Sequence, residues 1–278
     1  MFFHLKSVLL IAAVILSSAV FISAQDTDNK ENKEDKKENE TPAPAQQTID
    51  LSKNVTAEGV AESAIIIYGG LTGRNGLNQI RKTTYERGKM TIVNPDGTVD
   101  NANYQRWIIR GESLDKEKNR IEQQFPNTKY SLIYDGEKTF GVFNNTVFTP
   151  RESAVNSFEN QIWHGLEALL RYKENGSKLD LVGRDKIMGV DFYILDVTDK
   201  QNRKTRFYVS VKTLRVMMLE YEDEGVKYRR KFYNYNYSQG TLVPYRTVLW
   251  ADDKQIEETE IMTITFGQKV EENLFAMN

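Results

Sequence analysis

The chain has 278 residues and a formal net charge of −2, with 37 lysines and arginines against 39 acidic residues. It contains no cysteine, which excludes disulfide bonds. His4 and His164 are its two histidines, so it lacks the ligands of a structural zinc site. A nearly neutral chain is not built to attract nucleic acid or an anionic membrane surface.

Residues 1–24 are typical of a cleavable secretion signal. Lys6 precedes an apolar stretch over residues 8–20, which ends shortly before Ala24. The apolar run is short for a membrane span, so we predict an exported protein whose signal peptide is cut after Ala24. An uncleaved N-terminal anchor is the alternative. Without a cysteine at the cleavage point, the lipid modification of a bacterial lipoprotein is excluded.

Residues 25–47 have the composition of a disordered linker. Residues 25–40 hold seven acidic side chains and four lysines but no apolar residue, so they cannot bury enough surface to offset the entropy of ordering. The prolines in residues 41–45 favour a stiff, extended stretch. The linker is either a spacer or a solvated tail. We predict one folded domain over residues 48–278, which is close to neutral.

A helix opens the folded part. Thr56 can cap a helix over residues 55–68, and Gly69-Gly70 can end it. Residues 69–76 are rich in glycine but lack the Gly-Lys-Ser/Thr ending of a phosphate-binding loop. They indicate a flexible connection to the next element.

The apolar residues then alternate with a period of two, which is the pattern of β-strands. Short turns such as residues 94–97, with the sequence Asn-Pro-Asp-Gly, separate the runs and favour antiparallel neighbours. The expected strands cover residues 79–93, 104–111, 119–125, 129–134, 138–143, 178–183, 190–199, 204–211, 215–222, 226–237, 242–251 and 255–266.

One helix interrupts the strands. Thr149, Pro150 and Glu152 form a strong helix start, and the run ends at residues 175–176, Asn-Gly. His164 lies on the side of this helix away from its apolar stripe, so we expect it to face water. The stripe itself, at helical spacing, consists of Val155, Phe158, Ile162, Leu166 and Leu169.

Together these elements predict an α+β fold. Its centre is one large curved antiparallel sheet, a half-barrel of about twelve strands, with two helices over the concave face. Two helices are little cover for the large side chains of so wide a sheet. The surplus is expected to line an apolar cavity, and an interior that is packed solid is the alternative. The expected lining consists of Trp107, Ile109, Phe125, Leu132, Phe207, Val209, Met218, Phe232, Trp250, Met262 and Ile264.

The sequence contains no evident catalytic set. Residues 113–116 match the Ser-x-x-Lys pattern of serine acyl-enzymes, but the partner motifs are missing. Acidic pairs such as Glu257-Glu258 are better explained by solvated charge than by a metal site. The basic and aromatic segment 227–237 is better explained as an exposed sheet face than as a nucleic-acid surface. We therefore predict no enzyme, no metal and no cofactor; a hydrolase with two facing carboxylates is a further alternative.

The end of the chain carries the most distinctive pattern. Residues 242–246 read Leu-Val-Pro-Tyr-Arg, a polar turn follows at Asp252-Asp253, and residues 260–264 and 273–275 read Glu-Ile-Met-Thr-Ile and Asn-Leu-Phe. With the leader, the first helix, the long meander and the inserted helix, this order resembles the LolA-like family of periplasmic lipoprotein carriers and related lipid-binding proteins, such as outer-membrane lipoprotein-sorting proteins.

The resemblance implies a curved half-barrel with helices over its concave face, an apolar cavity for acyl chains, and no catalysis. It makes Arg81 a candidate for the arginine that the family carries on an early strand. This chain departs from the smaller carriers in its length and its acidic linker.

We therefore expect a monomeric carrier in the periplasm of a Gram-negative-type bacterium. It would shield the acyl chains of a lipid or lipoprotein and meet an envelope membrane protein that loads or receives them. The alternative is a non-catalytic structural or interaction protein of the envelope with a filled core.

Overall fold

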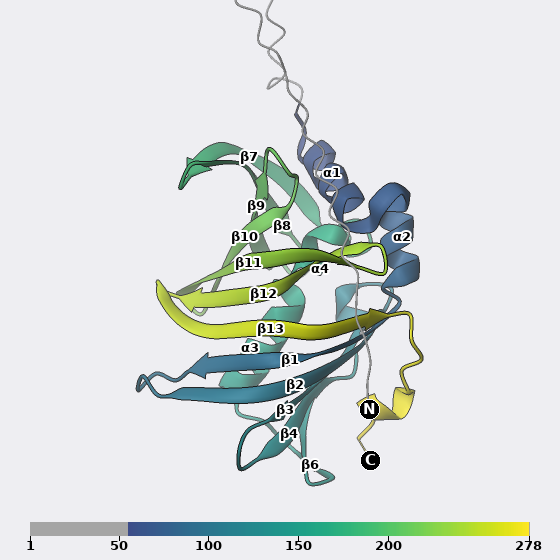
Figure 1. Ribbon diagram of the computed structural model, residues 1–278, viewed down its shortest axis with the longest axis vertical. Helices are drawn as coiled ribbons and strands as arrows, with labels where there is room; N and C mark the ends of the chain where they lie inside the picture. The colour runs from purple at the N-terminus through teal and green to yellow at the C-terminus, as the bar shows by residue number, and fades with distance from the viewer. Residues whose placement is uncertain (1–54, 278) are drawn as a thin grey trace, which may run out of the picture. The chain divides into compact units, whose positions relative to one another are not determined.

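An antiparallel sheet of thirteen strands organises residues 55–277, the part of the chain that the computed structural model describes. Figure 1 shows the sheet curving around α3 (Glu152–Trp163) and α4 (Leu166–Leu170), which confirms the predicted α+β half-barrel. The expected signal peptide over residues 1–24 and linker over residues 25–47 lie outside the described residues.

Twelve of the thirteen strands were expected from the period of two, and the additional one is the three-residue β6. The order across the sheet is β6-β5-β4-β3-β2-β1-β13-β12-β11-β10-β9-β8-β7. The bounds are β1 Thr83–Val93, β2 Val99–Ile109, β3 Lys118–Gln124, β4 Lys129–Tyr134, β5 Thr139–Phe143, β6 Thr146–Phe148, β7 Lys178–Ile187, β8 Val190–Thr198, β9 Lys204–Ser210, β10 Val216–Asp223, β11 Val226–Ser238, β12 Thr241–Ala251 and β13 Lys254–Phe266.

The chain enters the sheet in its middle. Strands β1 to β6 build outward to one edge, α3 and α4 lead across to the opposite edge, and β7 to β13 run back to the middle. There β13 pairs antiparallel with β1, with Phe266 opposite Thr84. Because α3 and α4 connect the two edges, they pass over one face of the sheet (Figure 1).

A β-bulge interrupts β13. Arg87 of β1 pairs with Thr263, whereas the next residue of β1 pairs with Ile261. Met262, between Thr263 and Ile261, is an extra residue without a partner on β1. A bulge of this kind shifts the alternation of side chains along the strand. Ile261 and Ile264 consequently line the same cavity, while Met262 is 61% exposed.

The helices differ from the expectation in two places. The glycine-rich segment after α1 (Ala57–Gly69) is not a flexible connection, because it forms a short 3-10 helix, Gly70–Thr72, and the helix α2, Gly73–Ile80. The predicted helix over residues 150–174 is divided into α3 and α4. Gly165 between them has an extended backbone, with φ −87° and ψ 179°, which ends the helical run.

The helix starts were predicted with mixed success. The Thr56 side chain accepts a hydrogen bond from the backbone N–H of Gly59 at 3.0 Å, so the predicted cap of α1 is confirmed. α3 begins at Glu152, after an N-cap at Arg151, and not at Pro150. Two further 3-10 helices, Leu114–Lys116 and Glu272–Phe275, complete the described elements.

The main core fills the space between the concave face of the sheet and the helices. Tyr68 of α1, Leu169 of α4 and Phe207 of β9 are each 0% exposed there. Tyr208 and Ile133 belong to two smaller clusters on the opposite face, because neighbouring residues of a strand point to opposite sides. None of the helices in residues 55–277 has the length and hydropathy that a membrane span requires.

Candidate functional site

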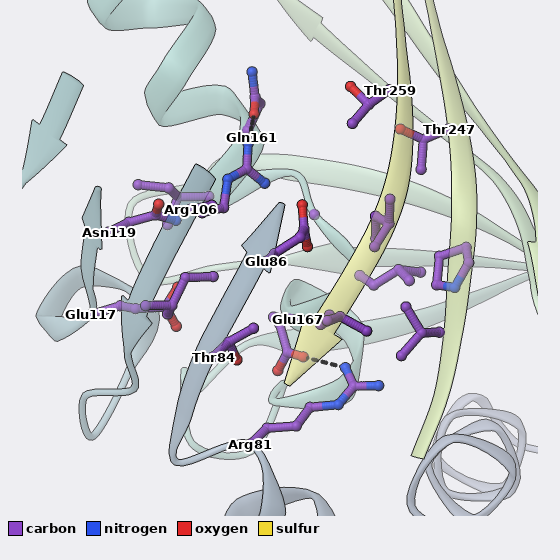
Figure 2. Close-up of a pocket in the computed structure, with 18 of the residues that line it drawn as sticks. Arg81, Thr84, Glu86, Arg106, Glu117, Asn119, Gln161, Glu167, Thr247 and Thr259 are labelled. Carbon is purple, nitrogen blue, oxygen red and sulfur yellow. Dashed lines mark hydrogen bonds and ion pairs between the residues drawn. The ribbon is translucent and has the colours of Figure 1, made fainter. Parts of the chain in front are cut away.

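A cavity of about 210 Å³ lies between the concave face and the α3–α4 segment. Strands β1 to β3 and β11 to β13 form its floor, and residues 161–167 of α3, α4 and the link between them form its roof (Figure 2). Apolar residues occupy part of the wall. The charged residues of the wall are Arg81, Glu86, Arg106, Arg110, Glu117, Glu167, Arg230 and Glu257.

Glu167 connects the roof to the sheet. One carboxylate oxygen accepts a hydrogen bond from Arg81 at 2.8 Å and the other from Arg110 at 2.5 Å. Arg81 also donates to the carbonyl oxygen of Leu242 at 2.8 Å, so the same guanidinium contacts the start of β12. Figure 2 shows Arg81 reaching Glu167 from the end of α2.

These contacts determine the charge state of Glu167. Burial alone would raise the pKa of its carboxyl, but the positive charges of Arg110, Arg81 and Arg171 outweigh burial and hold the pKa at about 2. Glu167 is therefore ionised at neutral pH, and it neutralises part of the arginine charge around it. The result is a roof that is held in place by ionic contacts in a partly buried setting.

A second ion pair lies beside the first. Arg171, just after α4, contacts Glu117 at 3.1 Å, and the two residues are 2% and 5% exposed. Burial raises the pKa of Glu117 to about 7, although Arg171 acts in the opposite direction. This carboxyl therefore changes its protonation state near neutral pH.

Glu86 and Arg106 face one another across β1 and β2 but take different partners. Glu86 accepts a hydrogen bond from the Tyr104 hydroxyl at 2.6 Å, and Arg106 donates to Gln161 of α3 at 2.6 Å. Burial, followed by the negative charge of Glu86, raises the pKa of Tyr104 above its ordinary value. The concave wall is thus bonded to both α3 and α4.

Gly88 leaves room for the Tyr104 ring. A Cβ at position 88 would lie 2.0 Å from the carbonyl oxygen of Glu260 and 2.9 Å from the Tyr104 hydroxyl oxygen. We expect Gly88→Ala to lower the free energy of unfolding by about 1–3 kcal/mol, as overpacking does. Urea denaturation measures the change. The comparison is Ala102→Gly, which removes a buried methyl and introduces no clash. Gly97→Ala is unsuitable as a control, because the φ of +84° at Gly97 strains any other residue.

The expected lining residues are divided between the two faces of the sheet. Phe232 and Ile264 line the cavity. Leu132, Phe207 and Val209 belong to the main core on the same face, where they pack below 10% exposure.

Three others pack on the opposite face. Trp107 and Ile109 lie against the cluster that contains Phe275, while their neighbours Arg106 and Ile108 line the cavity. Met218 belongs to the cluster of Phe192, Ile194 and Tyr208.

The remaining three lie in other places. Phe125 stacks on Tyr130 with ring centroids 5.9 Å apart, and Trp250 lies under the Lys231 ammonium at 5.0 Å. Met262 is the exposed bulge residue. None of the three is among the residues that line the cavity in the described part of the chain.

The expectation that His164 faces water is wrong. His164 is 4% exposed, its Nδ1 lies 2.6 Å from the Thr205 hydroxyl oxygen, and its ring stacks on Tyr221. Burial, followed by the charge of Arg203, lowers its pKa to about 4, so the ring is neutral at pH 7. The curved sheet also covers this side of the end of α3, through Thr205 of β9 and Tyr221 of β10.

The family resemblance pointed to Arg81, which was expected on an early strand and lies at the end of α2. Arg230 was assigned to an exposed sheet face and Glu257 to solvated charge, yet both line the cavity, and its other charged residues were not singled out. Glu117 and Arg171 are 54 residues apart in the hydrogen bond that joins them, so nothing local connects them. Glu167 offered a weak signal, because it follows the half-buried stripe residue Leu166, and a carboxylate that is partly buried there requires a partner.

The fold occurs in proteins of known structure. A DUF1329 family protein from Desulfovibrio piger ATCC 29098 is 16% identical, with a TM-score of 0.55, and the match covers 79% of this chain and 97% of that one. A LolA superfamily protein from Nitrosomonas europaea is 14% identical, with a TM-score of 0.53, over 80% and 98% of the two chains. No family model and no curated protein matches the sequence. At these identities the likeness concerns the fold, and the domain has a LolA-like fold.

Proposed function

We propose that this domain is a non-catalytic carrier or binding protein of the bacterial envelope, which shields an acyl chain of a lipid or lipoprotein in the cavity under α3 and α4. The observation that carries the proposal is the cavity itself, which lies between a LolA-like half-barrel and its helices. Part of its wall is apolar, where Ile108, Leu166, Phe232 and Ile264 lie. Each buried methylene of a guest contributes about 0.8 kcal/mol.

In this conformation the cavity has room for only a small ligand. Ligand pockets commonly have volumes of about 300–1,000 Å³, and this one has about 210 Å³. A long acyl chain would therefore require the roof to move. Because Glu167 holds the roof to Arg81 and Arg110, loading would break these contacts.

The targeting of the protein forms part of the same proposal. A signal peptide over residues 1–24 and a charged linker over residues 25–47 would deliver the domain from residue 48 onward to the periplasm. An envelope membrane protein that loads or receives the cargo is the proposed partner.

The small cavity also favours a second candidate, a structural or interaction protein of the envelope with a nearly filled core. The main core is continuous from α1 to β9, with Ile65, Tyr68 and Phe207 fully buried. Under this alternative the outer surface of the domain would carry the function.

Ligand uptake distinguishes the two candidates. Native mass spectrometry of the gently extracted full chain is expected to show a copurifying lipid, and the delipidated protein is expected to take up a fluorescent fatty acid. A clean protein mass together with no uptake would favour the structural role.

A cavity-filling variant locates the bound chain. Ile108→Trp places a larger side chain in the cavity wall, and we expect it to weaken uptake of the fluorescent fatty acid roughly tenfold, the effect of about 1.4 kcal/mol of lost burial. Val99→Trp, at a position that is 53% exposed on β2, is the matched control and should leave uptake unchanged. Equal uptake by both variants would place the acyl chain elsewhere.

A further inference from the structure

Arg230 of β11 differs from the other arginines of the cavity wall. It is 8% exposed, and its Nη2 is buried without a hydrogen-bond partner among residues 55–277. Arg81 and Arg106 each have a buried Nε without a partner, but their terminal nitrogens are bonded: Arg81 pairs with Glu167, as Arg110 does, and Arg106 donates to Gln161. In the described part of the chain, Arg230 takes part in none of the ion pairs that surround the cavity.

The two strands that pair with β11 place no acid opposite Arg230. Its register partners are Leu219 on β10 and Leu249 on β12, which are 0% and 4% exposed. The nearest acid along this row is Glu257 on β13, opposite Leu249. That position is two strand spacings away, or about 9–10 Å between backbones. Arg230 is therefore set in an apolar row and points into a cavity.

A buried guanidinium nitrogen without a partner is costly to a free protein. The positive charge of Arg230 is fixed, and the donors on its Nη2 lose water without gaining an acceptor. A structural arginine would be expected to have a carboxylate or several carbonyl oxygens around it, as Arg81 and Arg171 do. The planar fork of a guanidinium is well suited to a carboxylate or phosphate group, which it can bind through two parallel hydrogen bonds.

We propose that Arg230 binds the anionic head group, a carboxylate or phosphate, of a single-chain amphiphile whose acyl chain lies in the cavity. The proposal rests on the acyl-binding function above and specifies its cargo. Phe232 lies two residues along the same strand and also lines the cavity, so a chain attached to a head group at Arg230 would contact it. The head group would then be inside the domain, together with the tail.

Binding of matched ligands to the delipidated full chain tests the proposal. Decanoate and decanol have the same chain length but differ in charge, and acetate and inorganic phosphate are anions without a chain. We expect the wild-type protein to bind decanoate roughly 10- to 100-fold more tightly than decanol, as one hydrogen-bonded charge pair predicts. Acetate and phosphate should bind weakly, because they lack the chain.

Three variants test whether Arg230 is the residue that binds the anionic head group. Arg230→Met should reduce decanoate affinity to that of decanol and leave decanol affinity unchanged, which also shows that the variant is folded. Arg230→Lys should retain part of the preference, because an ammonium keeps the charge but loses the fork. Arg87→Met removes an exposed arginine of β1 and should change nothing. Free of ligand, Arg230→Met should also resist urea better than the wild type.

The outcomes separate this inference from the proposed function. Equal affinities for decanoate and decanol in the wild type would overturn the role of Arg230 and leave acyl binding intact. Phosphate or acetate that binds as tightly as decanoate would show a free-anion site and overturn the assignment to an amphiphile. Failure of both decanoate and decanol to bind would overturn the acyl-binding function itself. If Arg230→Met does not fold, the wild-type preference and its reduction in Arg230→Lys decide the matter.

Discussion

Replacing Glu167 with glutamine is expected to lower the free energy of unfolding by about 3–5 kcal/mol. The amide cannot neutralise Arg81 and Arg110, which are 10% and 8% exposed at their side chains, so two nearly buried charges would remain without a counter-charge. Urea denaturation at pH 7 measures the loss. Glu271→Gln is the matched control, because Glu271 pairs with Lys269 on the surface and should contribute less than about 1 kcal/mol.

The same carboxyl predicts sensitivity to acid. Its pKa is lowered from 4.5 to about 2 in the folded protein, so its contribution to stability is complete above pH 4.5 and is lost as the pH falls towards 2. The difference in stability between the wild type and Glu167→Gln should therefore narrow across this range. A difference that stays constant from pH 7 to pH 3 would contradict the ionic role of Glu167.

Glu117 predicts the opposite dependence at higher pH. Its pKa is raised from 4.5 to about 7 by burial, so the folded state favours its protonated form. The contribution of this group is complete below pH 4.5 and is lost as the pH rises to 7. The loss amounts to about 3 kcal/mol, at 1.36 kcal/mol for each pKa unit.

Glu117→Gln isolates this effect, because glutamine resembles the protonated carboxyl and does not titrate. The stability of the variant relative to the wild type is expected to rise steadily between pH 4.5 and pH 7. Urea denaturation of both proteins at several pH values in this interval gives the difference. The loss of the carboxyl partner of Arg171 adds a cost that does not vary with pH. A difference that does not vary with pH would contradict the raised pKa.

The strands were largely predictable from sequence because their signal is local. Alternating apolar residues and short turns mark twelve strands, and the structure contains each of them. β6 was missed since it spans only Thr146–Phe148, too few residues to show a period of two. The helices were less predictable. Gly165 breaks a run whose apolar stripe continues at helical spacing on both sides.

The face of each strand that points into the cavity was harder to predict than the position of the strand in the sequence. On β2 the apolar residues Trp107 and Ile109 were expected to form the cavity wall, yet Arg106 and Ile108 face the cavity. The reason is non-local: the C-terminal residues Leu274 and Phe275 cover the other face, and they give Trp107 and Ile109 an apolar environment there. The bulge at Met262 was also not predictable, because it reverses the alternation of side chains along β13 and leaves no signal in the sequence.

The junction between β1 and β13 sets when this protein can finish folding. It joins positions at the two ends of the described domain, Thr84 and Phe266, through the middle of the sheet. Pairing over such a sequence separation is entropically expensive and slow. During synthesis, neither half of the sheet can acquire its central neighbour until the last strand has emerged. Loss of the final strand would expose two long unpaired edges at the centre, where edge-to-edge aggregation is most favourable.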